Sequence, residues 1–291
     1  MSVKSIQMHY PIKTIALAVG ISIALSACVG IRPVAPSGTP MSRTSNLALG
    51  NPSGAGSNDP NNYLISRPQY VLSFSRDRGL ANWVSWVLSP VWKGDARRTN
   101  DFRPDLSLPQ GWYAAKPSDY TNTGFDRGHL CPSDDRDATP EDNAATFLLS
   151  NIVPQAPRHN REVWKNVEEY GRQLMEMGND VFIIAGASGG GGTGQNGYAT
   201  SLAGGKLTVP ATLWKILVVV PRGTDATFMV TENTRVIAVN IPNTQAAADK
   251  PWRAYVTTVD ALEQLTGYDF LSNVPTNVQR IIEARIDGGA S

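Results

Sequence analysis

The side chains best suited to acid–base chemistry in this chain are its histidines, of which there are three in 291 residues. His9 lies in an N-terminal segment with the features of a removed leader, so His129 and His159 are the remaining imidazoles. Imidazole has an unperturbed pKa near neutral pH, which makes it a natural general base for activating water. His129 ends the run Asp-Arg-Gly-His at residues 126–129. His159 has no such context, and we expect it to face solvent.

The three residues before His129 are expected to support it. Asp126 is interpreted as holding groups of a nearby loop or helix, and Arg127 as facing phosphate or pairing with an acid. Gly128 has no Cβ and therefore permits close backbone approach beside the base. Phosphodiester cleavage requires an activated water, neutralised phosphoryl charge and help for the departing oxygen. This run offers candidates for the first two requirements.

A second group of chemically capable residues lies on a helix predicted over residues 160–177. Asn160, Trp164, Glu168 and Arg172 are spaced by four and therefore advance around one broad helix face. Eight residues of α-helix span about 12 Å, which is too far for Asn160 and Glu168 to clasp one ion comfortably. A glutamate leaning toward the helix N-terminus could instead hold waters of such an ion. An exposed ion pair between Glu168 and Arg172 is the ordinary alternative.

The stretch from Gly124 to Arg172 resembles the DNA/RNA non-specific endonucleases, ββα-metal enzymes whose signature is Asp-Arg-Gly-His followed by a metal-binding Asn. The resemblance extends over nearly everything from about residue 47 to the C-terminus and is nearest to the secreted cyanobacterial members. Four further segments carry it, at residues 82–86, 100–105, 141–148 and 266–274.

This resemblance implies a Mg²⁺-dependent endonuclease, with Mn²⁺ as a possible substitute, that hydrolyses DNA and RNA to 5′-phosphate ends. It assigns the direct metal ligand to Asn160 through its amide oxygen. Arg98 matches the family's catalytic arginine, although Arg97 and Arg103 lie close by. Asn151 is expected to fix the backbone or the histidine loop. The implied catalytic set is His129, Arg98, Glu168, Asp126, Arg127 and Arg172, with Asn160 for the metal and Gly128 and Asn151 in support.

Charge and motif content restrict how such a protein could bind nucleic acid. The formal net charge is +1, and loss of residues 1–28 would leave 24 basic and 25 acidic side chains. Any nucleic-acid surface must therefore be a local basic patch. No zinc-finger, basic-zipper or helix-turn-helix signature is visible, so binding through phosphates is expected. A phosphodiesterase with a narrower substrate range and an inactive nucleic-acid-binding protein remain alternatives.

The N-terminal region predicts export. Residues 1–28 combine two lysines, an apolar segment and Leu-Ser-Ala-Cys, which is typical of a lipoprotein signal with Cys28 as the lipidated residue. An ordinary cleaved leader is the alternative. Residues 29–62 are rich in Pro, Gly and Ser and are predicted to be a flexible tether. The expected location is periplasmic, outer-membrane-anchored or secreted, with the catalytic domain over residues 63–291.

The remaining pattern predicts one α+β domain, with a central and largely antiparallel sheet flanked by helices and a ββα-metal motif within it. Thr139-Pro140 is a strong helix start. Residues 186–205 are glycine-rich and are expected to form a mobile hairpin loop. Cys131 is expected to be a small buried side chain without a disulfide partner. Strands are predicted within residues 69–88 and at 181–187, 213–220 and 236–241, then a last strand from 255 and helices at 260–266 and 277–285.

Overall fold

The computed structural model of the chain describes residues 45–223 and 230–289, together with Met1, Ser2 and Met8. The predicted leader, the predicted lipidation site Cys28 and the part of the tether before residue 45 lie outside the described residues. Within the part of the chain that the structure describes, no helix is both long enough and apolar enough to cross a bilayer. The described residues from 45 onward belong to one compact unit.

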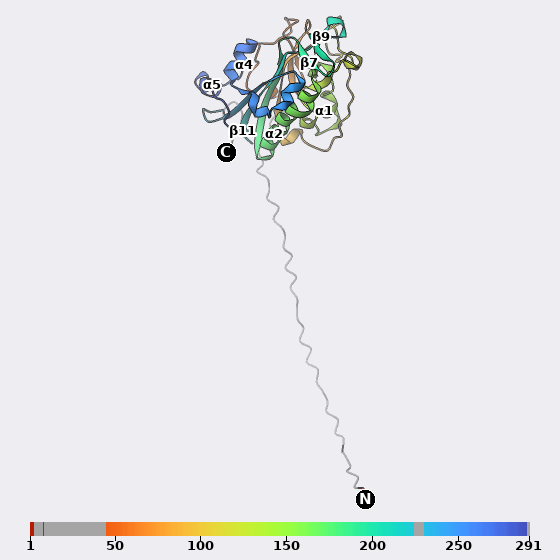
Figure 1. Cartoon of the computed structure of the whole chain (residues 1–291). Coiled ribbons are helices and arrows are strands. Elements are labelled where there is room, and N and C mark those ends of the chain that lie inside the picture. Colours follow the sequence, from red (N-terminus) through yellow and green to blue (C-terminus); the bar gives the residue numbers. More distant parts are fainter. Residues whose placement is uncertain (3–7, 9–44, 224–229, 290–291) are drawn as a thin grey trace. The chain divides into compact units, whose positions relative to one another are not determined.

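A seven-stranded antiparallel sheet forms the centre of this unit (Figure 1). Its two longest strands, β6 and β11, pair over ten residues, from Thr212 opposite Ser188 to Pro221 opposite Asn179. The strands and helices predicted from residue 69 onward are found close to their expected limits, and the predicted α+β class is confirmed. In spatial order the strands are β1 (Tyr63–Ser66), β2 (Val71–Ser75), β3 (Leu80–Leu88), β6 (Asn179–Ser188), β11 (Thr212–Pro221), β12 (Arg235–Pro242) and β13 (Val256–Thr257).

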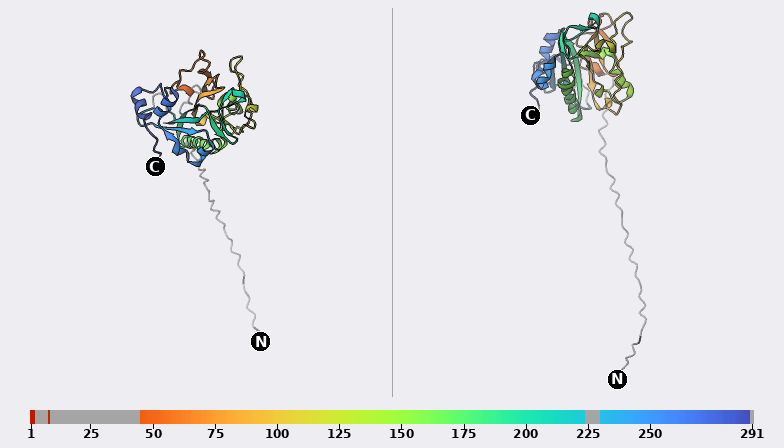
Figure 2. Two further views of the ribbon diagram at one scale, coloured as in Figure 1. Left: turned by 45° about the horizontal axis from the view of Figure 1, so that its top comes forward. Right: turned by 45° about the vertical axis from the view of Figure 1, so that its right-hand side comes forward.

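The sheet has an apolar core on each face because successive side chains of a strand point to opposite sides. The first core holds Trp86 and Leu217 beneath helix α2 (Lys165–Glu176). The second core holds Trp214 and Ile216 beneath the C-terminal helices, which gather on one side of the sheet (Figure 2). These helices are α4 (Val259–Thr266) and α5 (Thr276–Ile282).

Residues 45–62 are ordered, so the prediction that the tether extends to residue 62 is wrong for this part of it. Leu49 and Ala55 are buried in the second core. Asn46 donates to Pro68 O at 3.0 Å, and its own carbonyl accepts from Ser85 Oγ. A composition rich in Gly, Ser and Asn suggested disorder, but single buried side chains and asparagine hydrogen bonds hold this segment against the sheet.

The shorter elements include a capped helix and a hairpin. Thr139 caps helix α1 (Pro140–Ala145) by accepting from Asp142 N at 3.1 Å, as its sequence predicts. The glycine-rich stretch forms a hairpin of β7 (Gly192–Gly194) and β8 (Gly197–Ala199). The other short elements are β4 (Asp126–His129), β5 (Ile152–Gln155), β9 (Ser201–Leu202), β10 (Leu207–Thr208), a π-helix (His159–Trp164) and 3-10 turns at Ser45–Leu47, Pro90–Trp92, Pro117–Tyr120, Ser133–Asp135, Leu149–Asn151, Ala203–Gly205, Gln245–Asp249 and Trp252–Tyr255.

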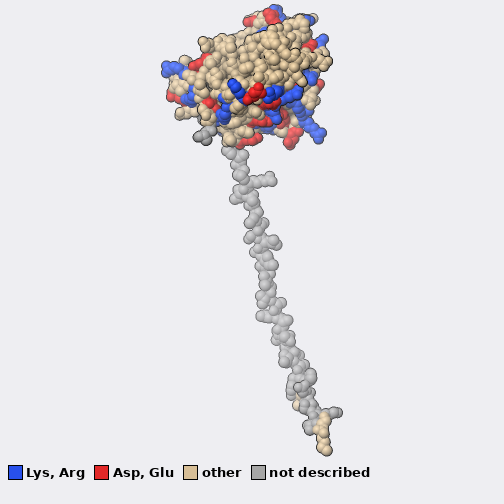
Figure 3. Space-filling model, viewed as in Figure 1, with Lys and Arg blue, Asp and Glu red and all other residues tan. Residues whose placement is uncertain are grey.

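The visible surface carries charges of both signs. Figure 3 shows basic and acidic side chains interspersed around a broad uncharged area on the face viewed. This distribution agrees with the near-zero formal net charge of the chain. A polyanion would therefore be attracted by a few local side chains and not by the protein's overall charge.

Candidate active site

A two-stranded ribbon followed by a helix positions the candidate site residues. In this ββα unit β4 pairs with β5, with His129 opposite Ile152, and the chain then enters the π-helix and α2. Gly128 lies against Gln155, whose side chain would overlap any Cβ at that position. The close approach predicted for Gly128 is therefore present. This contact brings the backbone of β4 against the Gln155 side chain of β5, at the residue before His129.

His129 is buried in an aromatic environment, with 7% of its surface exposed. Its ring centroid lies 4.9 Å from that of Phe147 and 5.4 Å from that of Phe102. Burial, reinforced by the charge of Arg98, lowers the pKa of His129 to about 3. The imidazole is therefore neutral at neutral pH, and its Nε2 has no hydrogen-bond partner. A neutral ring with a free nitrogen is in the form that a general base requires.

Arg98 reaches the same aromatic pair from an exposed loop. Its guanidinium carbon lies 5.0 Å from the Phe147 ring centroid, and its Nη1 donates to Ser133 Oγ. Its Nε donates to Asn100 Oδ1 at 2.8 Å. Asn100 has φ of 52°, a left-handed conformation that asparagine tolerates better than most residues. Two side-chain hydrogen bonds thus hold Arg98 beside His129, whereas its neighbour Arg103 is bonded to backbone and Asp101.

Arg127 points away from the sheet and stacks on Phe102, with 4.5 Å from its guanidinium carbon to the ring centroid. Its side chain is exposed, and it makes no ion pair with an acid within the described residues. Of the two roles predicted for Arg127, pairing with an acid is therefore not seen. Its guanidinium is available to an anion from outside.

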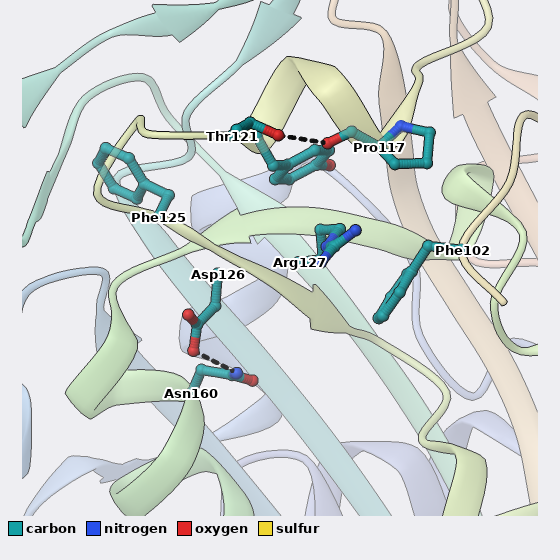
Figure 4. Close-up of a pocket in the computed structure, with 8 residues that line it drawn as sticks. Phe102, Pro117, Thr121, Phe125, Asp126, Arg127 and Asn160 are labelled. Atoms are coloured by element: carbon teal, nitrogen blue, oxygen red, sulfur yellow. Dashed lines mark hydrogen bonds between the residues drawn. The ribbon is translucent and has the colours of Figure 1, made fainter. Parts of the chain in front are cut away.

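Asp126 links β4 to the helix by three hydrogen bonds. It accepts from Asn160 Nδ2 at 2.9 Å, and from Arg161 Nε and Nη2 at 2.8 and 2.7 Å. Figure 4 shows the carboxylate of Asp126 facing the Asn160 amide nitrogen, with the amide oxygen on the other side. The orientation of Asn160 is thus set by Asp126, since only its NH₂ group can donate to a carboxylate.

A cavity of about 240 Å³ opens beside these groups. Asn160 and Arg127 contribute its polar side, and aromatic rings contribute much of the rest (Figure 4). A space of this size beside a guanidinium and a free amide oxygen suits a polar, partly aromatic ligand. Its lining residues are Phe102, Pro117, Tyr120, Thr121, Phe125, Asp126, Arg127 and Asn160.

The helix that carries Asn160 begins with a π-helical turn (His159–Trp164) before it continues as α2. The predicted helix is therefore present, but its first turn is wider than the α-helical spacing assumed for Asn160 and Glu168. Such wide turns are rare and occur often at functional sites. Trp164 ends this turn and donates from Nε1 to the carbonyl of His129 at 3.3 Å. The turn thereby ties the helix to the candidate base.

His159 is fully buried, so the expectation that it faces solvent is wrong. Its Nδ1 lies 2.8 Å from Gln155 Nε2, and burial lowers its pKa to about 3. Gln155 is the side chain that packs on Gly128. His159 is thus part of the packing behind the ribbon, at the point where the ribbon meets the helix.

Asn151 lies behind the histidine loop and bonds to it on both sides. Its Oδ1 accepts from Cys131 N at 3.0 Å, and its Nδ2 donates to Cys131 O at 2.8 Å and Thr146 O at 2.9 Å. These contacts hold the backbone two residues after His129, in keeping with the supporting role expected of Asn151. Cys131 is buried and free, as predicted.

The comparison with protein families matches residues 53–277 to the DNA/RNA non-specific endonucleases. The chain belongs to this family. A nuclease of Nostoc sp. is 46% identical over 92% of this chain and 97% of its own length. Human mitochondrial endonuclease G is 32% identical over 72% of this chain and 70% of its own. A crystal structure of an EndoG/EndoGI complex shares the fold, with a TM-score of 0.67 over 81% of this chain and 94% of that one at 23% identity.

In this endonuclease Glu168 is mostly covered, with 13% of its side chain exposed, which overturns the alternative of an exposed Glu168–Arg172 pair. Each residue has a different partner. Arg172 donates to Asp135 Oδ1 at 3.0 Å, and Asp135 also accepts from Trp86 Nε1 at 3.0 Å. Glu168 Oε1 lies 3.5 Å from Lys215 Nζ. Burial raises the pKa of Glu168 to about 7, while the positive charges of Lys215 and Arg172 oppose that rise.

Lys215 is a site residue that the sequence analysis missed. It lies on β11 with 1% of its side chain exposed, and its Nζ is 4.2 Å from the Trp164 ring centroid and 5.6 Å from that of Trp86. Burial lowers its pKa, and the carboxylate of Glu168 is the largest opposing influence. The available signal was a single charge within the otherwise apolar run of residues 213–220.

The buried pair of Lys215 and Glu168 should be strongly coupled energetically. Lys215→Met leaves Glu168 buried without its cation and should destabilise the protein by about 3–5 kcal/mol. Adding Glu168→Gln should restore part of that loss, giving a coupling energy of about 1–3 kcal/mol in a double-mutant cycle measured by urea unfolding.

The same helix offers a matched control in Lys165 and Glu169, an exposed pair at 3.2 Å. Its cycle should give only about 0.3–0.5 kcal/mol. Equal coupling energies for the two pairs would mean that burial adds nothing to the Lys215–Glu168 interaction.

Proposed function

We propose that this protein is a metal-dependent endonuclease that hydrolyses DNA and RNA without sequence preference and leaves 5′-phosphate ends. The observation that carries the proposal is that the ββα unit and the loop beside it hold three groups suited to phosphodiester cleavage. They are the neutral imidazole of His129 with its free Nε2, the guanidinium of Arg98 beside it, and the oriented amide of Asn160. Membership of the non-specific endonuclease family supports the proposal.

The residues present fit a divalent ion at Asn160. Because Asp126 takes the amide nitrogen, the amide oxygen is left to bind a hard cation such as Mg²⁺, with Mn²⁺ as a possible substitute. When bound, such an ion would act as a Lewis acid toward a phosphoryl oxygen. A site with one neutral protein oxygen suits Mg²⁺, which keeps several of its waters. Glu168 is the acid that we assign to support this site from the helix.

His129 and the arginines divide the remaining work. His129 Nε2 accepts the proton of the attacking water as the new phosphorus–oxygen bond forms and the bond to the 3′ oxygen breaks. Arg98, held beside His129, places a planar guanidinium near the charge that accumulates on phosphorus-bound oxygens. Arg127 offers a second guanidinium at the mouth of the cavity. Asp126, Asn151 and Gly128 hold these groups in place.

The proposed substrate range follows from the kind of contact that the site offers. Guanidinium groups bind phosphate, which every nucleic acid carries, and the aromatic rings of the cavity can stack on any base. Digestion of single- and double-stranded DNA and RNA side by side, with and without chelator, tests the range and the metal requirement. Cleavage of only one of these substrates would favour a phosphodiesterase of narrower range, and binding without cleavage would favour an inactive nucleic-acid-binding protein.

Removal of the proposed base should abolish most of the turnover. His129→Ala is expected to reduce plasmid-nicking kcat by about 10² to 10⁴, because His159, the other imidazole of residues 45–223 and 230–289, is buried behind the ribbon. Folding, measured by circular dichroism, and affinity for DNA should change little. Nicking at the wild-type rate would show that His129 is not the base.

The proposed metal role separates Asn160 from Glu168. Asn160→Ala removes the protein's direct ligand, so Mg²⁺ binding at this site, followed by calorimetry, should be lost at any accessible concentration. Glu168→Gln keeps the shape but loses the supporting charge. It should bind Mg²⁺ more weakly and recover part of its cleavage rate at high Mg²⁺. Glu169→Gln, at an exposed neighbouring position, is the control and should match the wild type. Rescue of Asn160→Ala by Mg²⁺, with none for Glu168→Gln, would reverse the assignment.

We also propose that the protein is exported and anchored through Cys28. The support is the sequence of residues 1–28, where an apolar segment leads into Leu-Ser-Ala-Cys. Expressed in bacteria, the full-length protein should fractionate with membranes, and Cys28→Ser should release it or block its maturation. Equal solubility of the two forms would instead indicate an ordinary cleaved leader.

A further inference from the structure

Three carboxylates meet where α4 lies against the end of α5, on the sheet face opposite Glu168 and Lys215. One oxygen from each of Asp260, Glu263 and Glu283 lies within 4.8 Å of the others. Asp260 and Glu263 belong to α4, and Glu283 directly follows α5. A backbone hydrogen bond from Asp260 N to Glu283 O, at 3.2 Å, joins the two segments at this point.

Glu283 is the unusual member of this group. Only 5% of its surface is exposed, and its Oε1 is buried without a hydrogen-bond partner. A buried carboxylate oxygen with no donor carries an uncompensated desolvation cost, so native proteins rarely keep one without a ligand or a function. The other two carboxylates differ from it. Glu263 Oε1 accepts from Phe270 N at 2.7 Å, and Asp260 is exposed to solvent.

No positive side chain compensates these acids. Within residues 45–223 and 230–289, no Lys, Arg or His forms an ion pair with Asp260, Glu263 or Glu283. Asp269 is a fourth acid nearby. Burial and the repulsion of Glu263 and Asp260 raise the pKa of Glu283 to about 8. The three carboxyl groups therefore have no basic side chain to balance them.

We propose that Asp260, Glu263 and Glu283 form a second cation site, which binds Ca²⁺. Carboxylate oxygens are hard ligands, and Ca²⁺ accepts them in irregular arrangements together with waters. The buried side of Glu283 would close the site from the core, and the exposed side of Asp260 would leave room for waters. Mg²⁺ suits this group less well, because it requires near-octahedral geometry and gives up its waters reluctantly.

Such an ion would join the two C-terminal helices to each other. Both helices cover the second core through Val259, Leu262, Val278 and Ile282, and the segment between them contributes Phe270. An ion shared between α4 and the end of α5 would stabilise this cover without touching His129 or Asn160. The site therefore predicts a Ca²⁺ effect on stability that does not depend on His129 or Asn160.

Calorimetry and thermal unfolding test the site without using activity. In an Asn160→Ala background, which removes the proposed active-site ligand, Ca²⁺ should bind once per chain with a Kd of about 10⁻⁴ to 10⁻³ M. At 10 mM Ca²⁺ the Tm should rise by about 3–10 °C. The same concentration of Mg²⁺ should give a smaller rise. Since the readout is binding and Tm, the outcome is independent of the proposed nuclease activity.

Two substitutions and one control locate the site. Asp260→Asn changes an exposed position and should fold normally, and Glu283→Gln keeps the shape of the buried side chain. Both should lose the Ca²⁺-dependent rise in Tm, whereas the exposed Glu176→Gln should keep it. An absence of Ca²⁺ binding, an equal response to Mg²⁺, or an unchanged Tm rise in Asp260→Asn and Glu283→Gln would overturn the proposal. Absence of binding would indicate that the carboxyls share a proton instead.

Discussion

The positive charge of Lys215, buried between the central sheet and helix α2, is the constraint on which the candidate site depends most. A fully buried ammonium group is costly unless opposite charge and polarisable surroundings compensate it. Here Glu168 supplies the charge at 3.5 Å, and the indole rings of Trp164 and Trp86 supply the surroundings. The same two indoles make further contacts, since Trp164 donates to the His129 carbonyl and Trp86 donates to Asp135, the partner of Arg172. One buried charge thus fixes the depth and direction of α2 relative to the ribbon.

This arrangement explains why a site of so few acids can be well ordered. The ribbon supplies His129 and Arg127, and the π-helical turn supplies Asn160, but each depends on a contact made by another element. Phe102 and Phe147 surround the imidazole, and Asp126 orients the amide. The candidate groups are thus held by side chains from other elements. Such preorganisation is what the proposed base and guanidinium would need in order to act on one phosphate.

Much of the fold and of the candidate site could be predicted from short segments of the sequence. The strands and the cap at Thr139 follow from residue types over short windows, and the run ending in His129 carries the family resemblance. Contacts between distant residues were not accessible in that way. Lys215 and Glu168 are far apart in the chain, and only the sheet brings them together. His159 was misplaced because no local pattern distinguishes a buried imidazole from an exposed one. Residues 45–62 were misjudged because composition does not show which asparagines find partners.

The link between Asp126, Asn160 and Arg161 has a consequence for how an anion meets this site. The carboxylate of Asp126 is matched by the guanidinium of Arg161, which binds it through two nitrogens, and Asn160 itself is neutral. Together, the side chains of Asp126, Asn160 and Arg161 therefore carry almost no net charge. Carboxylate ligands would cancel much of the charge of a divalent ion, whereas the neutral amide oxygen of Asn160 would cancel little of it. Glu168, the other acid assigned to this site, is matched by Lys215 at 3.5 Å. A phosphate arriving from solvent would therefore meet an ion whose charge is little cancelled, although the protein as a whole is close to neutral.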